Sequence, residues 1–313
     1  MPRPTKRRYF KELRIQQLQG FCETARSGSF AVAAETLSLS RPALWHQIRA
    51  LERELGADLV RRHGRGIEVT PDGTLLLELA EPLVTGFARL KTIFHERRGV
   101  IARHVTLASN ASLLANELRE PLHRFRSSHP DVQLTLVDRT SLEAARLIET
   151  GEADLAVVGR CDAEPLSALV TCEPLFTEPF VLICPRNHEL TRRRRVPLDL
   201  LIRFPCVLLA KETITRRQIE RVLHQHGLLD RLNVVVDTTN YDLVLDYVAA
   251  GLGISVLVSG PDLRRRKRLH VRSATDWFGE ETTVLLLKKG TYHSPHLKAL
   301  EEIIRQSMTQ MRT

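Results

Sequence analysis

The residues with the clearest chemical potential lie in the stretch SLSRPALWHQIRALERELG, residues 38–56. Arg41, Trp45 and Arg49 follow one another at intervals of four, so they share one face of a predicted helix. An arginine near the start of a helix can donate to guanine O6 and N7, and a tryptophan can contact a thymine methyl group or pack on a sugar. The pattern therefore indicates recognition of base edges in duplex DNA.

The same residues also allow a plainer interpretation, in which a small helical domain exposes a solvated face and Trp45 packs on a neighbouring element. The distribution of charge favours a nucleic acid. Residues 1–70 hold 13 Lys and Arg against 7 Asp and Glu, whereas the remaining chain holds 33 against 30. Two thirds of the net charge of +9 thus lies in about a fifth of the chain, as expected for a segment that binds a polyanion.

A helix-turn-helix would position the helix face that carries Arg41, Trp45 and Arg49 against DNA. Three helices are expected between residues 16 and 55, with Ser29 and Ser40 as caps of the second and third. Pro42 falls in the first turn of the third helix, where no N–H group is required. The apolar residues of that helix form one stripe that we expect to be buried: Leu44, Ile48, Leu51 and Leu55. Two helices joined by a tight turn, the second with a non-acidic outer face, are typical of a helix-turn-helix.

The segment DLVRRHGRGIEVT, residues 58–70, predicts a short two-stranded ribbon around a glycine turn. Such a ribbon would hold Arg61, Arg62 and Arg65 near phosphates or a minor groove. Ser29 would direct the start of the second helix at a phosphate. The DNA-binding residues expected in domain 1–70 are Ser29, Ser40, Arg41, Pro42, Trp45, His46, Arg49, Arg61, Arg62 and Arg65.

A long helix is expected over residues 71–98, with Thr70 as its cap, Pro71 at its first position and Asp72 favourable to its dipole. Apolar residues then recur at steps of three or four: Leu76, Leu79, Leu83, Phe87, Leu90 and Phe94. A narrow stripe of this length predicts pairing with a second copy of the chain. A helix that lies on its own domain is the alternative.

Strands and helices alternate through residues 99–313, which predicts an α/β domain with parallel sheets covered on both faces. The middle of this region looks like an insertion, so two lobes are expected. Lobe I takes about residues 103–170 and 275–313, and lobe II about 171–274. The cleft between such lobes lies at the carboxyl ends of the strands, where helix N-termini offer free N–H groups.

Hydroxyl and amide side chains follow several of these strands and begin the next helices. In such places they can cap a helix or bind a small polar or anionic effector, and both roles remain open. The expected effector-binding residues are Ser109, Asn110, Ser112, Thr140, Thr213 and Thr215.

Other functions are not indicated. No run approaches the roughly 20 apolar residues that span a bilayer, and the basic start has no apolar secretory segment, so we expect a cytoplasmic protein with no membrane partner. The five cysteines lack CxxC spacing and are expected to be free thiols. Gly251 and Gly253 stand between a helix and a strand, the wrong order for a dinucleotide site. His224 and His226 would point in different directions on a helix. We expect no enzyme activity, no cofactor and no metal site.

Residues 20–80 resemble the amino-terminal region of LysR-type transcriptional regulators, and weaker similarity continues over nearly the whole chain. The matching features, in order, are Phe21, Gly28-Ser29-Phe30, Ala33-Ala34, Leu37, Ser40, Pro42-Ala43-Leu44, Gln47-Ile48, Leu51-Glu52, Leu55-Gly56, Leu59, Arg62, Thr70 and Gly73. The chain departs from the family at residues 41–46, where RPALWH stands in place of the usual Gln-Pro-Ala-Leu-Ser-Arg. A family operator sequence therefore does not transfer to it.

The resemblance implies an α/β architecture with an N-terminal winged helix-turn-helix, a dimerising linker helix and a two-lobed effector domain like a periplasmic binding protein. It implies a homotetramer that binds double-stranded promoter DNA and responds to a small effector, with RNA polymerase as a further candidate partner. The alternative from another class is a cytoplasmic solute-binding or enzymatic two-lobed protein whose basic amino-terminal module makes protein contacts.

Overall fold

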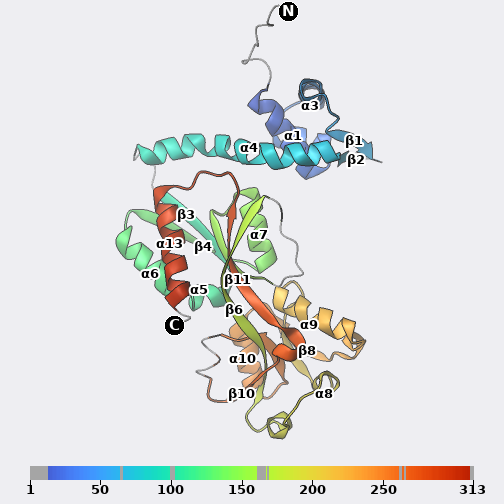
Figure 1. Cartoon of the computed structure of the whole chain (residues 1–313), viewed down its shortest axis with the longest axis vertical. Helices are drawn as coiled ribbons and strands as arrows, with labels where there is room; N and C mark the ends of the chain where they lie inside the picture. Colours follow the sequence, from blue (N-terminus) through green and yellow to red (C-terminus); the bar gives the residue numbers. More distant parts are fainter. Residues whose placement is uncertain are drawn as a thin grey trace, which may run out of the picture. The chain divides into compact units, whose positions relative to one another are not determined.

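The computed structural model describes residues 13–63, 66–98, 103–160, 167, 169–260, 263 and 266–310. The chain divides into two compact units. The first is Met1–Arg98 with Lys289–Tyr292, and the second is Gly99–Lys288 with His293–Thr313. Figure 1 labels the helices and strands of both units.

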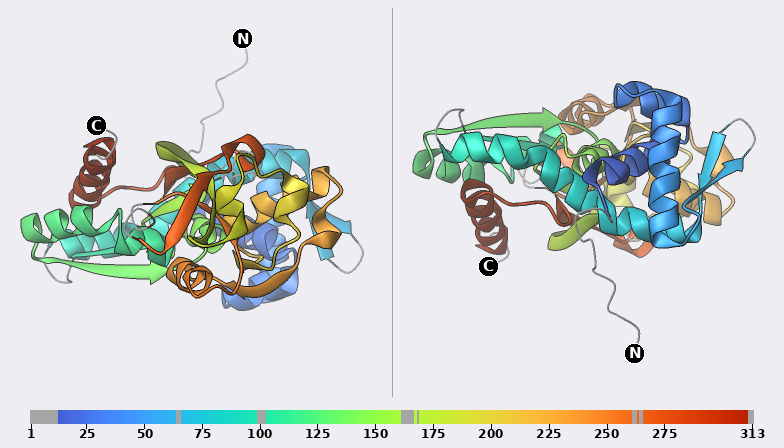
Figure 2. Two further views of the ribbon diagram at one scale, coloured as in Figure 1. Left: turned by 90° about the horizontal axis from the view of Figure 1, so that it is seen from below. Right: turned by 90° about the horizontal axis from the view of Figure 1, so that it is seen from above.

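Within the first unit, the residues that the structure describes form four helices and a two-stranded ribbon. Its elements are α1 (Ile15–Ser27), α2 (Phe30–Thr36), α3 (Arg41–Leu55), β1 (Val60–His63), β2 (Gly66–Val69) and α4 (Pro71–Arg97). The antiparallel ribbon projects from the helices (Figure 2). The predicted helix-turn-helix, ribbon and long helix are all present.

Short-range capping fixes where these helices begin. The Ser29 hydroxyl accepts from the N–H of Ala31 at 3.3 Å, and the Ser40 hydroxyl accepts from that of Ala43 at 3.3 Å. Thr70 caps α4 in the same way. These contacts confirm the capping expected from the sequence. The turn between α2 and α3 includes Ser38 at φ 53°, the left-handed conformation that lets the chain reverse.

The core of the first unit lies between α1, α2, α3 and the start of α4, and includes Phe21, Leu44, Ile48 and Leu51. The expected burial of Leu55 is wrong, because its side chain is 41% exposed. It is the last residue of α3, where Gly56 takes a left-handed conformation and ends the helix.

In the second unit, the described residues form nine strands. They are β3 (Arg103–Ser109), β4 (Val132–Asp138), β5 (Leu155–Arg160), β6 (Val170–Pro185), β7 (Cys206–Leu209), β8 (Val234–Thr238), β9 (Ser255–Val258), β10 (Leu269–Ser273) and β11 (Glu280–Lys288). The α-helices are α5 (Ala111–Ala115), α6 (Arg119–Ser128), α7 (Ser141–Thr150), α8 (Leu198–Leu201), α9 (Ile214–Gln225), α10 (Tyr241–Ala249), α12 (Thr275–Phe278) and α13 (Pro295–Gln310). Two short 3₁₀ turns, Glu189–Arg192 and Leu229–Arg231, complete the described elements.

These strands form the two expected lobes, and helices cover both faces of each. In lobe I, Ile148 of α7 packs on one face of the sheet, and Phe125 of α6 and Leu300 of α13 pack on the other. In lobe II, α9 and α10 contribute to two separate apolar clusters, to which Ile219 and Val248 belong.

The strand directions correct the expectation of purely parallel sheets. Pairing is parallel for β3 with β4, β3 with β5, and β7 with β8. However, β11 runs antiparallel to both β5 and β6, and β6 runs antiparallel to β9 and β10. The long strands β6 and β11 lie side by side and pass from one lobe to the other (Figure 1).

The lobe boundaries also differ from those expected. The strand β6 crosses the expected boundary at residues 170 and 171, and the continuous apolar run that is typical of a strand covers only its last six residues, FVLICP. Pro174 and Pro179 interrupt the sequence pattern in the preceding ten residues. Phe278, expected in lobe I, packs with Phe180 in the core of lobe II, so the return to lobe I begins with β11.

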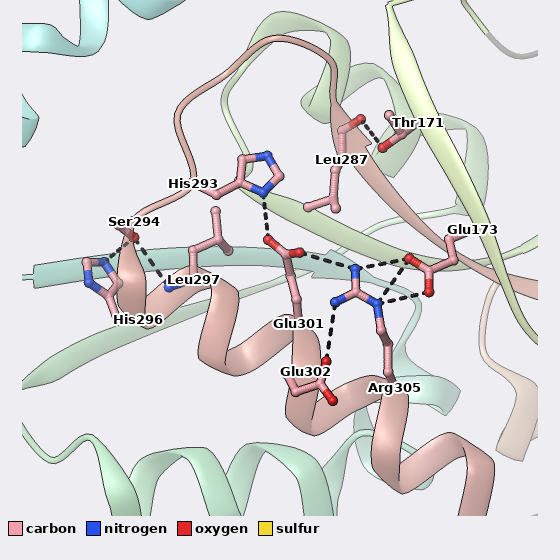
Figure 3. A network of polar contacts seen from close by, with 10 residues as sticks. All are labelled: Thr171, Glu173, Leu287, His293, Ser294, His296, Leu297, Glu301, Glu302 and Arg305. Atoms are coloured by element: carbon pink, nitrogen blue, oxygen red, sulfur yellow. Dashed lines mark hydrogen bonds and ion pairs between the residues drawn. The ribbon is translucent and has the colours of Figure 1, made fainter.

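A polar network holds α13 against β6 (Figure 3). The Arg305 guanidinium donates to both carboxylate oxygens of Glu173 at 2.9–3.1 Å and to Glu301 at 3.2 Å. The Nδ1 atom of His293 lies 2.8 Å from Glu301. Burial pushes the pKa of Glu301 upward, but the contacts with His293 and Arg305 outweigh it and lower the pKa below its ordinary value.

No helix among the residues described above combines the length and the apolar character that crossing a lipid bilayer requires.

Candidate DNA-binding surface and ligand cleft

The outward face of α3 carries the basic and aromatic residues singled out in the sequence. Arg41, Pro42, Trp45, His46 and Arg49 are all exposed, and Trp45 is exposed to 44% although it is large and apolar. The rings of Trp45 and His46 meet edge to face at 5.1 Å. The Arg49 guanidinium lies 5.5 Å from the centre of the Trp45 ring, within cation–π range. The face is thus exposed, and its side chains support one another.

The side chain of Arg49 is also held by a buried carboxylate of the same helix. Its Nη1 donates to Glu52 at 2.7 Å, and Glu52 is only 5% exposed. The other oxygen of Glu52 accepts from the backbone N–H groups of Leu59 and Val60 at 2.9 and 3.3 Å. One buried carboxylate therefore connects the α3 face to the start of the ribbon.

A hollow of about 500 Å³ brings most of the expected DNA-binding residues together. It lies between the start of α2, the outer face of α3 and the ribbon. Seven of the ten predicted residues line it: Ser29, Arg41, Pro42, Trp45, Arg49, Arg61 and Arg62.

The other three predicted residues lie outside this hollow. Ser40 is the α3 cap, and His46 lies beside Trp45 in an adjoining depression. Arg65 lies outside the described residues. The amide of Gln47 could pair with adenine if it faced the groove, but it turns toward α1, where a Cβ at Gly20 would meet its Oε1 at 3.2 Å. Its amide does not face the hollow.

Arg61 is partly neutralised within the ribbon. Its Nε donates to Glu68 on the facing strand at 3.0 Å. This contact raises the pKa of Arg61 and lowers the pKa of Glu68. Arg62 is exposed and lines the same hollow.

The long helix α4 exposes an apolar stripe. The large apolar residues on it are each more than half exposed: Leu75, Leu79, Leu83, Phe87, Leu90 and Phe94. Leu76, which the sequence placed in the stripe, instead packs against the core of the first unit. The other five residues of the predicted stripe are exposed.

A cavity of about 480 Å³ lies between the two lobes of the second unit, where α5, α7, α9 and α10 begin. Five of the six expected effector-binding residues line it: Asn110, Ser112, Thr140, Thr213 and Thr215. Three of them are also helix caps, since Asn110 accepts from Leu113, Thr140 from Glu143 and Thr213 from Arg216. We refer to this cavity as the cleft.

Ser109 was expected to bind the effector, but it does not line the cleft. Its side chain is fully buried, and its hydroxyl donates to the carbonyl oxygen of Val157 at 2.5 Å. It is the last residue of β3, and its hydroxyl crosses to the neighbouring strand β5 instead of facing the cleft.

Two family models match the chain. Residues 15–74 match the model "Bacterial regulatory helix-turn-helix protein, lysR family", and residues 98–309 match the "LysR substrate binding domain". The chain belongs to the LysR family. It is a transcriptional regulator with a DNA-binding helix-turn-helix and an effector-binding domain.

Relatives of this LysR-family regulator are similar over most of their length. It is 28% identical to the uncharacterized HTH-type transcriptional regulator YcgK of Bacillus subtilis, with 95% of each chain covered. It is 29% identical to the HTH-type transcriptional regulator cbl of Escherichia coli, with 89% of this chain and 88% of that protein covered. These relatives favour the regulator over the solute-binding or enzymatic alternative.

Solved structures agree with this fold. Full-length BenM superposes with a TM-score of 0.54 at 22% identity, covering 96% of this chain and 98% of BenM. The cofactor-binding domain of the Cbl transcriptional regulator superposes with a TM-score of 0.55 at 26% identity, covering 66% of this chain and 94% of that domain.

Acidic residues that the sequence did not indicate also line the regulator's cleft. Glu117, Glu178 and Glu281 line it, together with Asp138 and Glu143 nearer the helix starts. They come from separate segments of the chain and form no motif, so no local pattern indicates them. Burial raises the pKa of Glu281 to about 7, even though Thr215 donates a hydrogen bond to its carboxylate at 3.0 Å.

Proposed function

We propose that this regulator binds a two-fold-related promoter sequence through the exposed face of α3 and uses the ribbon to contact the DNA backbone. The observation that carries the proposal is the shared hollow, which gathers Arg41 and Trp45 of α3 with Arg61 and Arg62 of the ribbon. A helix fits the major groove, where arginine can contact guanine edges. Basic side chains on a ribbon can contact phosphates or an adjacent minor groove.

Self-association follows from the stripe on α4. Six large apolar side chains in a row on an exposed helix are typical of a surface that a partner covers. Two copies of α4 paired along this stripe would give a dimer, and a two-fold dimer would bind half-sites about one helical turn apart or at multiples of it. Family resemblance supports assembly of such dimers into a homotetramer in the cytoplasm, where RNA polymerase is a further partner.

Binding of an effector in the cleft would regulate DNA binding. Two strands, β6 and β11, join its lobes, so a ligand held by both lobes would favour one lobe arrangement over others. A ligand that binds the two arrangements with different affinity shifts their populations, and any coupling to DNA binding is reciprocal. The regulator needs no catalytic chemistry for this function.

A DNA-binding titration tests the proposal. Fluorescence anisotropy would compare the duplex upstream of the protein's own gene with a shuffled duplex of equal composition, over a series of salt concentrations. We expect tighter binding to the upstream duplex and a linear fall of log affinity with log salt for both. Equal affinity for the two duplexes would contradict sequence-specific binding. No binding to either would favour the two-lobed solute-binding alternative.

A further inference from the structure

Two arginine-rich segments lie in lobe II of the second unit. Residues 186–195 and 264–272, RNHELTRRRR and RRRKRLHVR, hold 11 Lys and Arg against one acidic residue, Glu189. The other residues between 71 and 313 hold 22 Lys and Arg against 29 Asp and Glu. Positive charge is thus concentrated in two short segments of a part of the chain that is otherwise acidic.

The fold brings these two segments side by side. The strand β10 runs antiparallel to the end of β6, and the N–H of Arg186 donates to the carbonyl oxygen of Arg268 at 3.2 Å. Further along β10, Nη2 of Arg272 donates to the carbonyl oxygen of Arg193 at 2.6 Å, which holds residues 192–195 beside the strand. Both segments therefore belong to one surface, at the end of lobe II away from lobe I (Figure 1).

Most of the basic side chains on this surface are exposed and have no counter-ion. Arg266 is paired with Asp242 and Asp246, and the nearby Arg203 with Asp199. Arg264 and Arg265 lie outside the described residues. Seven others are exposed, and within the described part of the chain their side chains form neither an ion pair nor a hydrogen bond: Arg186, Arg192, Arg193, Arg194, Arg195, Lys267 and Arg268. We refer to these seven residues as the basic edge.

Exposed charges of this kind fit a polyanion better than a small anion. One exposed ion pair contributes about 0 to 1 kcal/mol, so a small anion that contacts one or two arginines gains little. Duplex DNA presents a phosphate about every 3.4 Å along each strand, so it can contact several arginines at once and release its condensed counterions. A guanidinium also donates to two oxygens of one phosphate.

The composition of the two segments favours duplex DNA among the polyanions. Single-stranded nucleic acids bind by stacking bases on aromatic side chains, and neither segment contains Phe, Tyr or Trp. The buried centre of a protein interface is apolar and depleted of charge, whereas Val271 is the one large apolar side chain exposed among the described residues of the two segments. A regulator already bound to DNA also holds further phosphates at a high effective concentration.

We propose that the basic edge binds phosphates of duplex DNA outside the promoter site that the first unit contacts, without reading base sequence. The inference goes beyond the proposed function, which assigns DNA contacts to α3 and the ribbon alone. It requires affinity to depend on the DNA that flanks the promoter site, whatever the sequence of that DNA.

Two duplexes with the same promoter site test the proposal on the full-length protein. One is trimmed to the site that the protein protects in a footprint, and the other is extended at both ends by shuffled sequence. Fluorescence anisotropy would measure the affinity for each over a series of salt concentrations. We expect the wild type to bind the extended duplex more tightly and with a steeper fall of log affinity against log salt, because more phosphates are neutralised.

Charge reversal on either segment should remove this difference. Arg193→Glu with Arg194→Glu changes one segment, and Lys267→Glu with Arg268→Glu changes the other. Each double variant should bind the extended duplex about tenfold or more weakly, with a salt slope lower by about 2, and should bind the trimmed duplex almost as the wild type does.

A matched control separates this contact from an effect of net charge. Arg119→Glu with Arg146→Glu makes the same change of charge at exposed positions on α6 and α7, and should bind both duplexes as the wild type does. Circular dichroism, together with binding to the trimmed duplex, would show that every variant is folded.

Three results would overturn the proposal. Wild-type affinity of both basic-edge variants for the extended duplex would favour an acidic protein partner instead. An equal loss in the control would show only a dependence on net charge, and an equal loss on the trimmed duplex would place the contact within the promoter site. Failure of the proposed function is distinguishable, because it appears in the wild type as equal affinity for promoter and shuffled duplexes.

Discussion

Glu52 accepts from the guanidinium of Arg49 through one oxygen and from the N–H of Leu59 through the other. The face of α3 and the ribbon are therefore fixed to one buried group. Because an uncompensated buried N–H is costly, Glu52 sets the position of the ribbon relative to the helix as well as the orientation of Arg49.

Loss of this carboxylate should loosen the DNA-binding unit. Glu52→Ala leaves the N–H of Leu59 without its acceptor, and we expect the free energy of unfolding of this unit to fall by about 1 to 3 kcal/mol. Urea denaturation followed by circular dichroism would measure it. Glu35→Ala, at an exposed position on α2, is the control and should change stability little. Equal effects of the two substitutions would show that Glu52 has no special role.

Arg41 is expected to contribute to sequence preference. Arg41→Ala should weaken binding to the promoter duplex by about 1 to 3 kcal/mol, the usual worth of one base contact, and change binding to a shuffled duplex much less. Anisotropy titrations on both duplexes give the ratio. Arg203→Ala, which removes an exposed arginine of the effector domain, serves as the control. If both duplexes lose affinity equally, Arg41 contacts the backbone and not a base.

Arg62 is expected to act through phosphates. Arg62→Ala should weaken binding to promoter and shuffled duplexes alike and reduce the slope of log affinity against log salt by about 1. Anisotropy over a range of salt concentrations measures this slope. A selective loss of promoter binding, with an unchanged slope, would place Arg62 at a base edge instead.

The stripe on α4 should control self-association. Leu83→Glu places a charge among apolar side chains, and burying an unpaired charge costs several kcal/mol, so the dimer dissociation constant should rise by about a hundredfold or more. Analytical ultracentrifugation would measure it. Thr74→Glu introduces the same charge near the start of α4 at an exposed position outside the stripe, and should leave the assembly unchanged. An unaltered mass for Leu83→Glu would mean that α4 does not pair through this face.

Sequence patterns predicted what depends on neighbours along the chain. Ser29, Ser40 and Thr70 cap helices as expected, because a cap and its donor lie within three residues of each other. The buried Glu52 also left a signal, since it follows Ile48 by four residues and so falls on the apolar face of α3. An acidic residue on a buried face needs partners, and the ribbon supplies them.

What the sequence could not show depends on pairing between distant segments. The antiparallel contact of β6 with β11 brings Glu178 beside Glu281, and neither residue stands out in its own segment. Ser109 is the last residue of β3 and Asn110 comes directly after it, yet only the structure shows that the Ser109 hydroxyl reaches β5. The residue at which β3 ends therefore decides which side chain bonds within the sheet and which one caps α5.

Glu281 should make stability depend on pH. Its pKa is raised from 4.5 to about 7 by burial, so the folded protein binds a proton more readily than the unfolded chain between these values. Stability is therefore greatest below pH 4.5 as far as this group is concerned, and falls as the pH rises through about 7. The full loss corresponds to about 3 kcal/mol, at about 1.4 kcal/mol per pKa unit.

Glu281→Gln should remove this dependence, because an amide has no charge to bury and can still accept from Thr215. We expect the variant to be more stable than the wild type at pH 8 and close to it at pH 5, in urea denaturation with Glu120→Gln as the control. Comparison of wild type and variant cancels the titration of all other groups. Parallel pH profiles for the two proteins would show that Glu281 is ionised in the folded state at no cost.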